Sequence, residues 1–336
     1  MGEFRNSAEM ISSLVGTLSG LLREKYIFPE VAEEICQALV QHQSNGFYEY
    51  IDHGESLADT ITQHLREASR DDHLWVRYHS HPLPEHHGNL LENEEKLAEI
   101  KAIARQRNYG IPRVERLDGN VGLIEVRYFY RLEWGSQETG AAAMNFLANM
   151  HALIVDLRRC QGGNPHMVAF LSSYLFEGTP IHLNSLYWRS EERTEEYWTL
   201  PDVPGPRIGG KPVYVLTSGE TFSAGEGFTY NLQALNRVVV VGETTAGGAH
   251  PGSPFRLAPH FEAFIPMGRA INPITGANWE GVGVKPDIST PAESALDRAY
   301  VLALEGVIAS LEDAVSHPDR VLLAEAQNAF NQLKDA

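Results

Sequence analysis

The chain has 336 residues, of which 43% are hydrophobic and 21% charged, and its 27 basic and 44 acidic side chains give a net charge of −17. This length suffices for about two domains with a sizeable core, which excludes a disordered, collagen-like or disulfide-stapled protein. The negative charge repels phosphate backbones and anionic lipid headgroups, so we expect no nucleic-acid binding. Cys36 and Cys160 lie in unrelated contexts and form no Cys-x-x-Cys pair, which argues against a disulfide framework and against zinc.

The first 25 residues are too polar for a signal peptide, and no run of about 18 apolar residues follows anywhere. We therefore expect no membrane span. The sequence as it stands predicts a cytoplasmic protein, and a periplasmic or secreted one if a native leader has been removed.

Residues 7–70 carry apolar side chains at spacings of three and four, the pattern of amphipathic helices. Breaks at residues 28–30, 44–46 and 53–55 divide this stretch into three helices. Such a set packs as a small bundle, although the sequence does not say against what. We expect residues 1–70 to form an N-terminal helical cap.

From residue 71 onward, short apolar runs alternate with helical stretches. The expected strands are residues 74–78, 122–130, 152–157, 212–216 and 238–241, and the expected helices are residues 93–106, 140–150, 165–175 and 223–235. This alternation predicts an α/β fold whose mixed, partly parallel β-sheet is flanked by helices and buried on both faces. We place this core at residues 71–310 and a helical tail at residues 311–336.

Ser223 follows an apolar strand and a Gly-bearing turn, at the start of an amphipathic helix (residues 216–228, LTSGETFSAGEGF). The positive end of a helix dipole and nearby backbone N–H groups favour an oxyanion there, which suits a nucleophile. Serine is also a preferred helix cap, and this segment alone favours the cap.

A second buried strand ends in the loop of residues 157–165, which carries adjacent glycines at Gly162 and Gly163. Glycines at this position allow backbone N–H groups to approach a bound group, as an oxyanion hole requires, and they are equally typical of a plain tight turn. Asp156, at the end of the strand, needs a hydrogen-bonding partner.

His73 lies just before a strand and is a candidate general base for a serine. Four further histidines, His79, His81, His86 and His87, follow in a Pro-rich segment whose spacing does not place them on one helix face. We therefore predict no designed metal site.

Glu280 heads a Gly-rich segment (residues 279–287, WEGVGVKPD). A carboxylate there can orient an imidazole as the third member of a triad, and it can equally be a solvated surface glutamate.

Taken together and in order, these segments resemble peptidase family S41, which holds the C-terminal processing proteases, the tricorn protease core and the interphotoreceptor retinoid-binding protein modules. The resemblance is strongest to the last branch and runs from about Leu14 to about Tyr300. It rests on Tyr26 and Pro29 in the helical start and on DHL (72–74), NYGIPRVERL (108–117), GNVG (119–122), DLR with GG (156–158 and 162–163), SAGE (223–226) and GETTAGGAHP (242–251).

The resemblance implies a ClpP/crotonase-like catalytic core with Ser223 as nucleophile, His73 as triad histidine and Glu280 as triad glutamate. The backbone N–H of Ala224, with that of Gly162 or Gly163, matches the oxyanion hole. The processing proteases use a lysine where residues 242–248 here contain none, so a Ser-Lys dyad is excluded. Only 35 residues separate Arg77 from Pro112, too few for the PDZ domain of those proteases.

The function that this resemblance implies is a serine peptidase that hydrolyses peptide bonds through an acyl-enzyme, with a peptide or protein substrate and no cofactor. Two alternatives stay open: a non-proteolytic module that binds an apolar ligand such as a retinoid or fatty acid, and an acyl hydrolase or transferase with a non-peptide substrate. Without a PDZ domain, substrate selection would fall to the helical bundle and to the loop of residues 184–204. The aromatic side chains of this loop either line a cleft or pack on the core; they are Tyr187, Trp188, Tyr197 and Trp198. The sequence leaves the oligomeric state undetermined.

Overall fold

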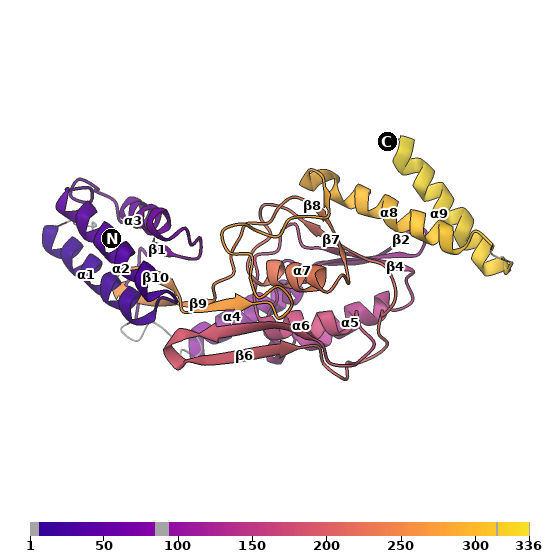
Figure 1. The fold of residues 1–336 in the computed structure, drawn as a ribbon, viewed down its shortest axis with the longest axis horizontal. Coiled ribbons are helices and arrows are strands. Elements are labelled where there is room, and N and C mark those ends of the chain that lie inside the picture. Colours follow the sequence, from indigo (N-terminus) through magenta and orange to yellow (C-terminus); the bar gives the residue numbers. More distant parts are fainter. Residues whose placement is uncertain (1–6, 85–93, 314, 336) are drawn as a thin grey trace. The chain divides into compact units, whose positions relative to one another are not determined.

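A computed structural model describes residues 7–84, 94–313 and 315–335 (Figure 1). The chain divides into two compact units, each built from separate segments. We call the first the helical unit (Met1–Glu99, Ser185–Glu195 and Gly248–Ile271) and the second the core unit (Ile100–Asn184, Glu196–Gly247 and Asn272–Ala336). The helical unit thus continues past residue 70 and includes two segments from later in the chain. Each unit is described by itself below.

The helical unit begins with the three amphipathic helices that the sequence predicts: α1 (Ala8–Lys25), α2 (Pro29–Ser44) and α3 (Gly54–Ser69). Ser7 caps α1 because its hydroxyl accepts the backbone N–H of Met10 at 3.1 Å. Pro29 opens α2, where its fixed φ suits the first helical position. Arg70 closes α3 in the left-handed conformation, with φ 58°.

These helices pack on an antiparallel sheet, which is the surface that the sequence analysis could not identify. β1 (Trp75–Tyr78) pairs with β10 (Phe261–Pro266), and β10 pairs with β9 (Gly252–Ala258). The apolar side chains of all three helices share one buried cluster with the sheet residues Ala263 and Ile265. A segment nearly 190 residues downstream therefore completes the N-terminal core, a long-range pairing that local sequence patterns do not reveal.

Residues 184–204, expected as a loop, contain a β-hairpin instead. β5 (His182–Trp188) and β6 (Arg193–Trp198) pair around the short turn η3 (Arg189–Glu191), and β11 (Gly268–Ile271) adds a third strand. Most residues of β6 are polar, so its sequence lacks the apolar run by which the other strands were predicted.

The core unit is built on a six-stranded sheet in the order β12-β8-β7-β4-β3-β2. Only the β2–β3 pair is antiparallel. The strands are β2 (Arg113–Leu117), β3 (Val121–Glu125), β4 (Ala152–Asp156), β7 (Val213–Thr217), β8 (Val239–Gly242) and β12 (Ile288–Ser289). The predicted mixed α/β architecture is confirmed.

Helices cover both faces of this sheet, as the alternation along β4 shows. Leu153 and Val155 join a cluster with α5 (Ser136–Leu147), α6 (Pro165–Ser173) and α7 (Ala224–Ala234). Ala152 and Ile154 join another with α8 (Ala295–Ser310) and with α9 (His317–Asp335), which lies in the predicted helical tail. Successive side chains of a strand point to opposite faces, so every position of β4 is buried.

Between β1 and β2, the described residues form α4 (Glu94–Gln106) and the short turn η1 (Asn108–Gly110), with no PDZ-like domain among them. Two further short turns are η2 (Leu132–Trp134) and η4 (Ala292–Ser294). None of the described helices combines the length and apolar character that crossing a membrane requires.

Candidate active site

Ser223 occupies the predicted position between β7 and α7, immediately before the first residue of the helix. Its backbone has φ 53° and ψ −117°, outside the extended region in which a helix-capping serine usually lies. A non-glycine residue at such angles stores about 1–3 kcal/mol of strain, which is typical of functional positions. Its side chain is half-buried. The backbone therefore distinguishes Ser223 from an ordinary cap.

Glu226, one turn into α7, fixes this strained backbone. Its carboxylate is fully buried and accepts the backbone N–H of Ser223 at 2.8 Å. It also accepts the Thr245 hydroxyl at 2.6 Å and the backbone N–H of Gly247 at 2.6 Å. Three donors on one buried carboxylate satisfy the charge that burial would otherwise penalise. Sequence reasoning assigned Glu226 no role, although Ser-x-x-Glu is the spacing of a capping box.

The glycine loop lies directly against the serine. A Cβ built on Gly162 would stand 2.8 Å from Ser223 Cβ, 3.2 Å from Ser223 Oγ and 3.3 Å from the backbone nitrogen of Ala224. Gly162 has φ 102°, a conformation that glycine adopts readily. The space beside the serine oxygen thus exists because residue 162 has no side chain.

Gly163 faces a different neighbour. It has φ 131°, and a Cβ there would lie 2.2 Å from the carbonyl oxygen of Phe129. Phe129 holds the loop on both sides, because its N–H donates to Gly162 O at 2.8 Å and its carbonyl accepts the N–H of Asn164 at 2.6 Å. Gly162 is therefore the glycine that borders Ser223, and Gly163 is the one that lets the loop dock.

Asp156 has the partner that its burial demands. Arg158 binds it through two side-chain hydrogen bonds, Nε to Oδ1 at 2.9 Å and Nη2 to Oδ2 at 2.7 Å. The third nitrogen of the guanidinium donates to Ala292 O at 2.7 Å. This ion pair ties the start of the glycine loop to the turn before α8. Cys160, in the same loop, is buried, and burial raises the pKa of its thiol to about 12, so it is no nucleophile at neutral pH.

Glu280 lies in a turn that is connected to Glu226. The N–H of Gly281 donates to Gly247 O at 2.8 Å, and the N–H of Val284 donates to the Thr245 hydroxyl at 2.7 Å. Gly247 and Thr245 are two of the three residues that donate to the Glu226 carboxylate. Glu280 is half-buried rather than fully solvated, and its backbone N–H donates to Asn278 Oδ1 at 3.0 Å.

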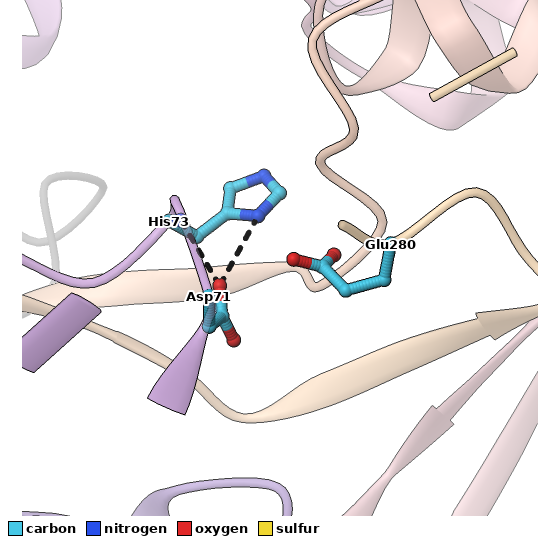
Figure 2. Close-up of side chains that lie close together, drawn as sticks. All are labelled: Asp71, His73 and Glu280. Carbon is cyan, nitrogen blue, oxygen red and sulfur yellow. Dashed lines mark hydrogen bonds and ion pairs between the residues drawn. The ribbon is translucent and has the colours of Figure 1, made fainter. Parts of the chain in front are cut away.

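His73 belongs to the helical unit, where Asp71 anchors it (Figure 2). Asp71 Oδ1 accepts the backbone N–H of His73 at 3.0 Å and lies 3.7 Å from His73 Nδ1. Asp71 Oδ2 accepts the hydroxyl of Tyr26 at 3.1 Å and Nδ1 of His250 at 2.8 Å. Sequence reasoning gave Asp71 and His250 no role, although both stand in or beside the motifs on which the resemblance rests.

Two other sequence hypotheses concern the remaining histidines and aromatics. His79 pairs with Glu262 at 2.8 Å and His81 with the Ser80 hydroxyl at 3.1 Å, while His86 and His87 lie outside the described residues. Among the expected cleft aromatics, Tyr197 is buried, which favours packing, whereas Trp198 is 42% exposed and stacks on His182. Tyr187 and Trp188 belong to β5.

In the core unit the structure thus brings together Ser223, Ala224 and Gly162, and it connects the Glu280 turn to the same buried carboxylate. His73 stands with Asp71 in the helical unit.

Solved structures with this fold include several proteases. A peptidase from Parabacteroides merdae ATCC 43184 is 16% identical with a TM-score of 0.61, covering 89% of this chain and 98% of that one. The photosystem II D1 C-terminal processing protease is 13% identical with a TM-score of 0.52, covering 96% and 99%. A lipoprotein from Streptococcus agalactiae is 13% identical with a TM-score of 0.53, covering 91% and 99%. At these identities, the likeness establishes the fold.

The sequence also matches two family descriptions. Residues 5–107 match the N-terminal domain of peptidase family S41 in eukaryotic IRBP, the interphotoreceptor retinoid-binding protein, and residues 120–290 match peptidase family S41 itself. The second match spans more than half of the chain and contains Ser223, Gly162 and Glu280. The chain belongs to peptidase family S41 and is a serine-type peptidase.

Proposed function

We propose that the protein hydrolyses peptide bonds by acyl transfer to Ser223. Ser223 Oγ attacks the scissile carbonyl carbon while His73 takes the hydroxyl proton. The tetrahedral intermediate then collapses, the C–N bond breaks, and His73 returns the proton to the leaving amine. Water, activated by His73, hydrolyses the acyl-enzyme and regenerates the serine.

The observation that carries this proposal is the environment of Ser223. Its backbone is strained, its N–H is fixed by Glu226, and Gly162 keeps the space beside Oγ open. The contact with Glu226 also occurs in an ordinary capping box, but a residue that only capped a helix would need neither the strained backbone nor the open space beside Oγ. In the proposed role, the N–H of Ala224 and one glycine N–H stabilise the oxyanion, with Gly162 favoured over Gly163 because it borders the serine.

Glu280 is proposed as the carboxylate that holds His73 in the productive tautomer. Its turn shares hydrogen bonds with the residues that Glu226 binds, so one buried carboxylate organises both the nucleophile and the acid. Replacing an orienting triad carboxylate with its amide costs about 10⁴-fold in kcat in serine proteases.

The test is labelling with a fluorophosphonate, followed by intact-mass spectrometry. We expect one adduct per wild-type chain and none on Ser223→Ala or His73→Ala, with slower labelling of Glu280→Gln. If Glu280→Gln labels and turns over substrate like wild type, Glu280 leaves the triad. If folded wild type forms no adduct, the serine is not activated, and the apolar-ligand module becomes the better account of the family match at residues 5–107.

The proposed substrate class is a peptide or protein, as membership of a peptidase family implies. Peptide libraries and small ester or thioester substrates assayed in parallel separate this from a non-peptide acyl substrate, because the nucleophile and oxyanion hole would serve both. Turnover of esters alone would replace the peptidase proposal with an acyl hydrolase.

A further inference from the structure

Asp71 is almost completely buried in the helical unit and receives donors from three separate parts of the chain. It is 1% exposed, and its contacts Tyr26, His250 and His73 are 1%, 5% and 7% exposed. Tyr26 comes from the end of α1, His73 from the segment before β1 and His250 from the segment before β9. A buried carboxylate is retained only where its hydrogen bonds compensate the cost of burial.

The two carboxylate oxygens contact different groups. Oδ2 accepts the Tyr26 hydroxyl at 3.1 Å and His250 Nδ1 at 2.8 Å, both from the surrounding scaffold. Oδ1 accepts the backbone N–H of His73 at 3.0 Å and lies 3.7 Å from that residue's Nδ1 (Figure 2). Asp71 therefore connects the scaffold on one side to His73 on the other.

The charge on Asp71 acts on the His73 ring. Burial opposes ionisation, but the interactions with His250 and His73 outweigh it and hold the pKa of Asp71 well below its ordinary value. Asp71 is thus a carboxylate at any pH at which the imidazole can act as a base. At 3.7 Å it favours positive charge on the ring by Coulomb attraction, which is the charge that a general base acquires.

The rings of both histidines are also held by aromatic neighbours. His73 stacks on Phe264 of β10 with 6.2 Å between ring centroids, and His250 meets the edge of Phe28 at 5.3 Å. Other charged pairs of the helical unit include Arg66 with Asp72, 4.0 Å apart and largely exposed, and His79 with Glu262, 2.8 Å apart. Glu262 is buried as well and pairs with His79. Asp71 is a buried carboxylate that lies beside the His73 ring.

We propose that Asp71 is a positioning residue for the general base His73, and that His250 is a positioning residue that acts through Asp71. This inference rests on the proposed function, because it requires His73 to be the base. It adds a second carboxylate to the acid that the family resemblance supplies in Glu280.

The test measures the rate of fluorophosphonate labelling of Ser223, and kcat and KM where a substrate is in hand, between pH 5 and pH 9. Asp71→Asn keeps the size of the side chain and removes its charge. We expect labelling and kcat to fall by about 10²–10⁴-fold with little change in KM. The pH profile of the rate should also change, because the substitution removes a negative charge 3.7 Å from the ring that takes the proton.

His250 offers a matched pair of variants. Asn places an amide donor near the position of Nδ1, whereas Leu has a similar size and no donor. We expect His250→Leu to slow labelling by about 10–100-fold, through misplacement of Asp71, and His250→Asn to restore most of the rate. Thermal unfolding of each variant reports whether the chain is folded.

Glu262→Gln is the control, because Glu262 is also a buried carboxylate that pairs with a histidine, His79, at 2.8 Å. In the sheet it stands opposite Arg77. This variant should label like wild type. The inference is wrong if folded Asp71→Asn keeps the wild-type rate and pH profile while His73→Ala abolishes labelling. It is also wrong if His250→Leu and His250→Asn behave alike. Full labelling of His73→Ala would instead refute the proposed function itself, and the inference with it.

Discussion

Gly162→Ala is the substitution that most directly tests the chemistry assigned to the glycine loop. The added methyl would lie 2.8 Å from Ser223 Cβ and 3.2 Å from Oγ, closer than carbon and oxygen atoms normally approach. Residue 162 also has φ 102°, so alanine is strained there whatever the space. The two effects together should cost about 1–3 kcal/mol of stability.

The effect on activity should be larger than the effect on stability. The methyl enters the space where the oxyanion would form, and relief of the contact displaces the Ala224 N–H or the serine. Loss of one oxyanion donor typically costs about 10²–10³-fold in kcat, so labelling of Gly162→Ala should fall by at least that factor.

Gly210→Ala is a matched control, because residue 210 has φ 78° and a Cβ there would meet nothing within 4 Å. It imposes backbone strain without a contact. We expect a loss in thermal unfolding temperature from the strain alone, and a wild-type labelling rate. Should folded Gly162→Ala label as fast as Gly210→Ala, the glycine loop would have no part in the reaction, and the oxyanion hole would have to be sought elsewhere.

Three further predictions concern buried polar groups. Glu226→Gln places an amide against three donors and should lose about 1–3 kcal/mol of stability and slow the labelling of Ser223, as urea unfolding and labelling will measure. Asp156→Asn weakens its two bonds from Arg158 and should cost about 1–3 kcal/mol in the same urea assay. Burial, together with the stacked ring of His42, lowers the pKa of His64 from 6.5. At low pH the unfolded chain therefore binds more protons at His64 than the folded chain does, so the stability from His64 is present above pH 6.5 and lost as the pH falls. We expect the urea midpoint of the wild type to drop between pH 8 and pH 5.5 by more than that of a folded His64→Gln variant.

The sequence revealed those parts of the fold whose signals are local. Apolar spacing of three and four identified α1, α2 and α3, and apolar runs identified β4 and β7, because burial on one or both faces leaves a direct pattern. β9, β10 and the β5–β6 hairpin were missed. Their burial depends on partners far away in the chain, so their own residues carry a weaker pattern.

For the site, motif resemblance found Ser223 and Gly162, because a strand followed by a turn and a helix sets a recognisable order of residues. It did not separate the roles of Gly162 and Gly163, which differ only in what a Cβ would meet. Nor did it identify Asp71. That residue precedes the Asp72-His73 motif by one position, and its importance comes from Tyr26 and His250, whose proximity only the fold creates.

The two residues proposed for proton transfer, each in its own unit, are held by the same interaction, a buried carboxylate that accepts the backbone N–H. Glu226 accepts the backbone N–H of Ser223 at 2.8 Å, and Asp71 accepts the backbone N–H of His73 at 3.0 Å. Each carboxylate is buried and has further donors from distant segments, so its orientation is set by the fold of its own unit. A charged acceptor makes a stronger hydrogen bond than a neutral one. Each unit can therefore fix the residue proposed for catalysis within it before substrate arrives, which is one requirement for electrostatic preorganisation of a triad.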